Sequence, residues 1–302
     1  MTTNTPPSAA AHDRQARARL ALEGLSIADA FGEQLLHAGP HARLSAVEHH
    51  RAPSSPRWSW TDDTAMAISI VEVLARHDGI DEAALADRFA ARYMLDPARG
   101  YGRGAHQVLE AIHAGVPYRE AAQQLFGGQG SCGNGGGMRS APIGAYFADD
   151  LGAVVVHAAR SAAPTHAHPD GAAGAVAVAV AAARVAAGER DPRALLEAVV
   201  AHTPAGPTCD GIRRSLAMLA AEPVTVAMEL GNGSRVISSD TVPFAVWCAA
   251  THLADYAAGL WACGAVGGDV DTTCAMVGGI VVGAVGLDGI PAPWRAAREP
   301  LP

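Results

Sequence analysis

Apolar residues recur at the spacing of an α-helix along most of this chain. From residue 17 onward, the pattern predicts short amphipathic helices over 65–76, 82–94, 104–115, 118–126, 152–163 and 191–202. Prolines fall near the predicted helix starts and glycines near the ends, where each residue type is tolerated best. Alternation with period two is rare, and the one segment that suggests a strand, 224–230, has no identifiable pairing partner. The pattern therefore predicts an all-α fold.

Two runs are almost apolar enough to suggest a membrane span. Residues 171–183 and 272–287 are rich in Ala and Gly, but both are shorter than the roughly 18–20 residues that a bilayer requires. We interpret both as core helices. The N-terminus lacks the basic-then-apolar order of a signal peptide, and we expect residues 1–13 to form a disordered tail. Residues 14–302 are then one domain, because no linker or fixed-period repeat divides them.

Composition narrows the class of protein. The chain has 302 residues, of which 49% are hydrophobic and 17% are charged, and this excludes wholesale disorder. Its net charge is -8 and it has no dense run of Lys or Arg, so nucleic acid is a disfavoured partner. Five cysteines without a C-x-x-C pair indicate neither a disulfide framework nor a cysteine zinc site. We expect a cytoplasmic monomer without a membrane partner.

Two acidic clusters are the most informative chemical feature. Each precedes an apolar helix, and the members are Thr61, Asp62 and Asp63 in the first cluster and Asp269, Asp271 and Thr272 in the second. Capping of the following helix explains either cluster alone. Together, four carboxylates at the starts of buried helices repel one another unless a cation lies between them. Oxygen ligands select hard cations such as Mg²⁺ or Mn²⁺, so the clusters indicate a pair of such ions and the hydrolysis of an anionic substrate.

Two further segments carry candidate binding residues. The glycine-rich segment 132–142 is interpreted as a loop, because its glycine density disfavours a helix, and it serves either as a turn or as a phosphate cradle. His166 and His168 form an H-x-H pair, which in a zinc hydrolase would end a barrel strand. The flanking sequence here is helical, so a cap, a loop position or a neutral imidazole beside a sugar phosphate fits better.

Six segments together resemble motifs of the ADP-ribosylglycohydrolase family. They come in the family's order over about residues 20–287: GLSIADAFG (24–32), WTDDT (60–64), GNGGGMR (133–139), THAHP (165–169), DTVPFAVW (240–247) and GDVDTT (268–273). The resemblance implies a compact orthogonal helical bundle over residues 14–302. It also implies an enzyme that cleaves the bond between the anomeric ribose carbon of ADP-ribose and an acceptor, either a modified protein side chain or a small conjugate. Two Mg²⁺ or Mn²⁺ ions are implied, held by Thr61, Asp62, Asp63, Asp269, Asp271 and Thr272.

The resemblance and the chemistry together assign further roles. Catalysis is assigned to Glu33, Asp62 and Asp271, and the diphosphate and distal ribose to Asn134, Gly135, Gly136, Gly137, Met138 and His166. Adenine needs a stacking face, for which Tyr101, Phe126 and Tyr146 are the candidates.

The chain departs from the family motif at two positions. Ala28 stands where the family usually has glycine, and Leu36 stands where members commonly carry a glutamate. Glu33, directly after Gly32, is assigned as the acidic residue near the metals because it lies nearby in the sequence. The other interpretation is that Glu33 is only a helix charge.

Three alternatives to an ADP-ribosyl hydrolase stay open at the level of sequence. One is a catalytically silent ADP-ribose-binding relative of the same fold, and another is a zinc amidohydrolase built on His166 and His168. The third, a purely structural helical protein, leaves the four buried aspartates unexplained.

Overall fold

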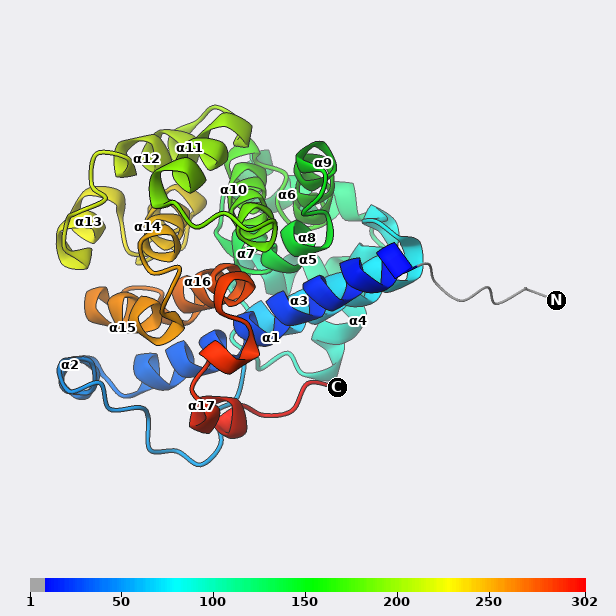
Figure 1. Cartoon of the computed structure of the whole chain (residues 1–302). Coiled ribbons are helices and arrows are strands. Elements are labelled where there is room, and N and C mark those ends of the chain that lie inside the picture. Colours follow the sequence, from blue (N-terminus) through cyan, green and yellow to red (C-terminus); the bar gives the residue numbers. More distant parts are fainter. Residues whose placement is uncertain (1–8) are drawn as a thin grey trace.

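The structure, a computed structural model, describes residues 9–302, and its regular elements there are helices without any strand (Figure 1). The first nine are α1 (Ala9–His37), α2 (Pro40–Glu48), α3 (Asp62–His77), α4 (Glu82–Leu95), α5 (Arg103–His113), α6 (Tyr118–Gly128), α7 (Gly135–Met138), α8 (Ala141–Tyr146) and α9 (Leu151–Ala162). The rest are α10 (Pro169–Ala186), α11 (Pro192–His202), α12 (Pro207–Ser215), α13 (Pro223–Leu230), α14 (Ser238–Thr251), α15 (Tyr256–Val266), α16 (Val270–Val285), the 3₁₀ turn η1 (Leu287–Gly289) and α17 (Ala292–Ala297). The prediction of an all-α fold is confirmed.

The periodicity located most helices correctly and failed at a few places. The six predicted amphipathic helices correspond to α3, α4, α5, α6, α9 and α11. The possible strand at 224–230 is instead helix α13, because Val226 and Leu230, four residues apart, bury one helical face. Of the expected tail, residues 1–8 lie outside the described part of the chain, whereas α1 already begins at Ala9.

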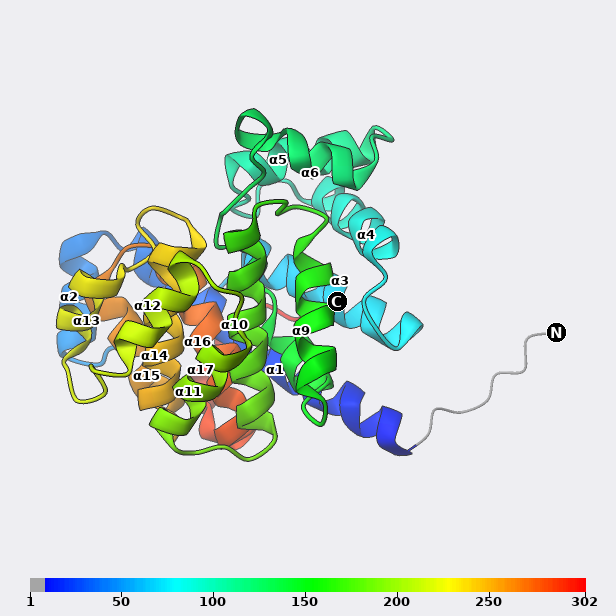
Figure 2. The same ribbon diagram turned by 90° about the horizontal axis from the view of Figure 1, so that it is seen from above.

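Two long apolar helices, α10 and α16, form the centre of the molecule. By length and composition α10 is able to cross a membrane, but 78% of it is buried inside the protein. It packs against α7, α8, α9, α11, α14 and α16, and Figure 2 shows it surrounded by other helices. Both apolar runs are therefore core helices, as the sequence indicated.

Helix α1 packs along α16 at very short range. Small residues allow this contact. A Cβ atom at Gly278 would lie 2.3 Å from Cβ of Ala28 and 2.7 Å from the carbonyl oxygen of Gly24. The Tyr256 hydroxyl donates a hydrogen bond of 2.5 Å to the same Gly24 oxygen. This close contact brings the middle of α1 to the start of α16, and α3 contacts both helices there. Three helices distant in the sequence thus meet at one point.

The close contact predicts a difference between two glycines of α16. We expect Gly278→Ala to lower the free energy of unfolding by about 1–3 kcal/mol, because its methyl group has no space. Gly283→Ala is the matched control, since its Cβ would meet neighbours no nearer than 3.4 Å and alanine favours the helix. Urea denaturation of both variants measures the difference. A Gly278→Ala protein as stable as the wild type would contradict this account of the packing.

Candidate functional site

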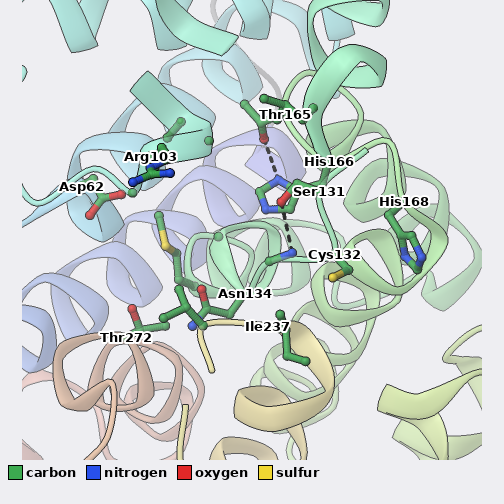
Figure 3. A pocket seen from close by; sticks show the side chains of 18 of the residues that line it. Asp62, Arg103, Ser131, Cys132, Asn134, Thr165, His166, His168, Ile237 and Thr272 are labelled. Carbon is green, nitrogen blue, oxygen red and sulfur yellow. Dashed lines mark hydrogen bonds between the residues drawn. The ribbon is translucent and has the colours of Figure 1, made fainter. Parts of the chain in front are cut away.

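A cavity of about 600 Å³ lies where these helix starts meet, a volume typical of small-molecule sites. Its walls come from the starts of α3, α5 and α16, the end of α6, the glycine-rich loop before α7, the turn between α9 and α10 and the loop before α14. Figure 3 shows that Asp62 and Thr272 lie on one side, whereas His166 and His168 lie on the other. The cavity therefore brings together four of the six motif segments quoted above, whereas residues 24–32 of α1 and 240–247 of α14 lie behind its wall.

Asp29 of α1 fixes the start of α3 and is fully buried. Its carboxylate accepts hydrogen bonds from the backbone N–H and hydroxyl of Thr61 (2.9 and 2.8 Å) and from those of Thr64 (3.1 and 2.5 Å). Thr61 is also the N-cap, accepting from the N–H of Asp63 at 3.4 Å. Burial raises the pKa of Asp29 to about 7, although these hydrogen bonds oppose the rise. The sequence motifs assigned no role to Asp29. A carboxylate within an apolar helical stretch could have indicated one, because such a group can be buried only if hydrogen-bond donors surround it.

The four predicted aspartates face one another without a compensating cation. Burial raises the pKa of Asp269 to about 8 and raises the pKa values of Asp62 and Asp63 well above their usual range, and mutual repulsion adds to the rise. Oδ1 of Asp63 and Oδ1 of Asp271 are buried and have no hydrogen-bond partner. Within residues 9–302, no Lys, Arg or His pairs with these carboxylates. The cluster therefore contains carboxylates whose ionisation is unfavourable and two oxygens that lack a partner.

The second acidic cluster is held by the glycine-rich loop and by the loop before α14. The Asn134 side-chain amide donates to Asp269 Oδ2 at 2.6 Å and to the Thr241 hydroxyl at 3.1 Å. The Asp269 N–H donates to the carbonyl of Asn232 at 3.2 Å. Gly233 has a φ of 87°, and a Cβ there would lie 2.6 Å from Cβ of Asp269. Asn134, expected to bind substrate, thus also positions an acidic residue.

Glu33 lies beside Asp271 but outside the cavity wall. Gly32 precedes it, and a Cβ at Gly32 would lie 2.6 Å from Cα of Asp271, so α1 touches the start of α16 here. The Glu33 side chain is 22% exposed. Burial, and then the charge of Asp271, raise the pKa of Glu33. Leu36, at the position of the family's glutamate, is 43% exposed, so besides the buried Asp29 the acid of α1 that lies near Asp271 is Glu33.

The predicted substrate residues divide into two groups. Those that line the cavity are Asn134, Gly135, Met138 and His166. Gly136 and Gly137 lie beneath it: a Cβ at Gly136 would lie 2.8 Å from the Gly171 carbonyl of α10, and one at Gly137 would lie 3.1 Å from Met276. The segment was expected to be non-helical, yet 135–138 forms the single turn α7, because packing against α10 overrides the low helix propensity of glycine.

The two histidines have different local roles. His168 is the N-cap of α10, its Nδ1 accepting from the Asp170 N–H at 3.1 Å. Nδ1 of His166 lies 2.7 Å from the Thr165 hydroxyl, and its Nε2 lies beside the glycine-rich loop. Burial, and then the charge of Arg139, lower the pKa of His166 to about 3, so the ring is neutral. In the part of the chain that the structure describes, no three His, Cys, Asp or Glu side chains converge into a ready-made metal-ligand group.

One of the three aromatic candidates presents a ring to the cavity. Phe126 lies on the cavity wall, is 64% exposed and has left-handed backbone angles (φ 53°, ψ 46°). Tyr101 and Tyr146 are buried in the core, so neither offers a free face. The geometry therefore favours Phe126.

The chain is similar to known proteins over most of its length. The model of the ADP-ribosylglycohydrolase family matches residues 10–300. The chain is 31% identical over 280 residues to the ADP-ribosylhydrolase ARH3 of Bos taurus, covering 80% of this chain and 74% of that protein. It is 30% identical to the human ARH3 over 280 residues, with the same coverage, and 30% identical to that of Xenopus tropicalis over 275 residues, covering 80% and 77%.

A solved structure shares the fold. It is titled ADP-ribosylglycohydrolase-related protein complex and superimposes with a TM-score of 0.64 at 24% identity, covering 94% of this chain and 92% of that one. The likeness extends over the whole helical arrangement rather than over the cavity alone.

The raised pKa values predict how the stability of chelator-treated protein depends on pH. The folded cluster retains protons that the unfolded chain releases near pH 4, so stability is greatest at low pH and falls as pH rises toward about 8. We expect Asp62→Asn to reduce this fall, because it removes one of the repelling charges. Asp81→Asn, at the exposed N-cap of α4, is the control, and its stability should fall with rising pH as that of the wild type does. Thermal unfolding at pH 5 and pH 8 tests this, and equal pH profiles for wild type and Asp62→Asn would contradict it.

Proposed function

Because this chain belongs to the ADP-ribosylglycohydrolase family, we propose that it is a metal-dependent hydrolase that cleaves the bond between the anomeric ribose carbon of ADP-ribose and an acceptor. Family membership makes it a hydrolase acting on ADP-ribose linkages. One observation supports the metal dependence: two clusters of buried, uncompensated carboxylates meet at a cavity, and two of their oxygens have no partner. The substrate is an ADP-ribosylated protein or a small ADP-ribose conjugate.

The donor set fits hard divalent cations. All candidate ligands offer oxygen atoms, and the residues that would hold Mg²⁺ or Mn²⁺ are Thr61, Asp62, Asp63, Asp269, Asp271 and Thr272. The unpartnered Oδ1 atoms of Asp63 and Asp271 support this assignment, since a cation would satisfy both. Because the aspartates do not converge into a closed group, oxygens of the substrate and of water would complete the coordination. When bound, two such ions supply positive charge that orients ribose hydroxyls and a water molecule.

The chain's own residues account for the rest of the reaction. Cleavage passes through a transition state with oxocarbenium character, and the carboxylates of Asp62 and Asp271 would offset the positive charge at the anomeric carbon. Glu33 is the proposed general base. Its pKa is raised, and a base accepts a proton from water most effectively when its pKa lies near the working pH. Proton transfer through Asp62 is the other route.

The opposite side of the cavity suits the remainder of the substrate. We assign the diphosphate to the glycine-rich loop and His166, where backbone and imidazole groups are within reach of an anion. Arg103 and Arg235 also line the cavity and add positive charge to it, and Figure 3 shows Arg103 beside Asp62. Adenine is assigned to the exposed ring of Phe126, since base–aromatic stacking needs a free face.

A catalytically silent ADP-ribose binder is the second candidate. The observation that favours it is the exposed Leu36 at the position where family members commonly carry a glutamate. Binding would then require the same cavity and metals, but no competent base.

The metal assignment predicts the effect of Asp271→Asn. Loss of one anionic ligand should lower both turnover and affinity for ADP-ribose by roughly 100-fold, while the fold survives. Release of ADP-ribose from a panel of differently linked substrates, with Mg²⁺ or Mn²⁺ supplied, measures turnover, and calorimetry measures affinity. Asp288→Asn, a fully exposed acid after α16, is the control. Full activity after exhaustive chelation, or an unaltered Asp271→Asn enzyme, would refute the assignment.

The assignment of Glu33 predicts a separation of binding from turnover. Glu33→Gln should keep ADP-ribose affinity and metal content while turnover falls by roughly 10²-fold or more, the scale expected for loss of a general base. Glu48→Gln, an exposed glutamate at the end of α2, is the control.

Two other results would change this conclusion. Wild-type turnover in Glu33→Gln would assign proton transfer to an aspartate instead. A wild-type protein that binds ADP-ribose but releases none from any linkage would establish the silent binder, and Leu36→Glu would then be the variant with which to restore activity.

A further inference from the structure

A buried arginine lies in the wall of the cavity. Arg139 directly follows α7 and is fully buried, and within residues 9–302 it forms no ion pair. Its guanidinium donates to the Ser161 carbonyl and to the Thr165 hydroxyl, both at 2.8 Å, and lies 4.5 Å from the ring centre of Phe89. Burial lowers its pKa to about 9, so it remains charged at neutral pH. Burying a charge without an opposite charge beside it is costly, so the burial of Arg139 calls for a functional explanation.

The direction of these hydrogen bonds determines the tautomer of His166. A guanidinium has no acceptor, so the Thr165 oxygen accepts from Arg139. The threonine's own proton is then free to be donated, and its described acceptor is Nδ1 of His166 at 2.7 Å (Figure 3). A second donation to this oxygen, from Nδ1–H, would leave the proton of the buried Thr165 hydroxyl without a described acceptor, so the geometry favours an unprotonated Nδ1 and a proton on Nε2.

Nε2 of His166 faces the segment that we assign to the diphosphate. Cβ atoms at Gly133 and Gly135 would each lie 3.3 Å from Nε2, so these glycines leave space for the imidazole edge. On its other side, a Cβ at Gly171 would lie 3.1 Å from Cβ and Cδ2 of His166. The ring is thus held between the glycine-rich loop and the first turn of α10, and it opens onto the cavity.

We propose that Arg139 is a positioning residue that acts through Thr165 to hold His166 as an Nε2–H hydrogen-bond donor to an anionic oxygen of the substrate's diphosphate. This inference rests on the proposed function for the identity of the ligand. The low pKa of His166 supports it, because a neutral ring donates through one nitrogen only and the tautomer decides which. Arg139 itself touches no part of the substrate in this proposal.

Thr165 is the residue to alter, because valine has the same shape without the hydroxyl. We expect Thr165→Val to raise the dissociation constant for ADP-ribose, measured with Mg²⁺ present, by roughly 10-fold. Without the hydroxyl, His166 is no longer held to donate its Nε2–H hydrogen bond to the charged diphosphate. The KM should rise by the same factor with kcat within about twofold, and Thr165→Ser should restore both values. Thr203→Val is the matched control, since that buried hydroxyl donates to a carbonyl within α11.

A spectroscopic measurement on the full-length protein tests the tautomer without any assay of activity. Nitrogen NMR of histidine-labelled protein, with the signal assigned from His166→Gln, should show the proton of His166 on Nε2. A proton on Nδ1 would overturn the inference even if Thr165→Val failed to fold. A folded Thr165→Val protein with the wild-type dissociation constant would overturn it as well. If the Nε2 proton and the change in affinity are found but no linkage is hydrolysed, the proposed hydrolysis fails and this inference stands.

Discussion

Repulsion among buried carboxylates is the interaction on which the rest of this structure depends. Asp62 and Asp63 are buried and Asp269 and Asp271 are partly buried, no cation from residues 9–302 pairs with them, and ionising them together opposes folding. Much of the surrounding architecture compensates by holding the backbone. Asp29 fastens the start of α3 to α1, and Asn134 fastens Asp269 to the glycine-rich loop. Favourable contacts elsewhere in the bundle thus offset the cost of holding these carboxylates close together. Such an arrangement is typical of a site that a bound ligand completes.

The cavity separates its charges instead of pairing them. The aspartates occupy one side and the neutral imidazole of His166 the other, whereas the buried guanidinium of Arg139 in the wall is held by Ser161 and Thr165 instead of a carboxylate. An ion pair between Asp62 and Arg139 would satisfy both groups and leave nothing for a ligand. ADP-ribose has hydroxyls on a ribose at one end and an anionic diphosphate in its middle, so a cavity divided in this way matches the polarity of that molecule.

Sequence reasoning located the helices and the acidic clusters for reasons that are local. Periodicity and capping residues act within a few positions, and two Asp-rich helix starts are visible without any knowledge of the fold. What it missed depends on tertiary contacts. In the sequence, Val226 and Leu230 fit an alternating strand. Only the structure shows that they bury one face of a helix. The roles of Asp29, of Gly136 under α10, and of Arg139 behind Thr165 each require a partner more than 20 residues away. The choice of Phe126 over two tyrosines likewise follows only from exposure.

The contact between α1 and α16 also has a consequence for the order in which the protein is made. One acidic cluster lies near residue 62 and the other near residue 270, and they meet only because Gly24 and Gly278 let the first and one of the last helices touch. During synthesis the N-terminal residues emerge first, so α1 and α3 exist for most of translation without their partner helix. A nascent chain, or a fragment cut before α16, therefore has half of the aspartates and no site. The cavity can therefore form only after α16 has been synthesised, late in translation.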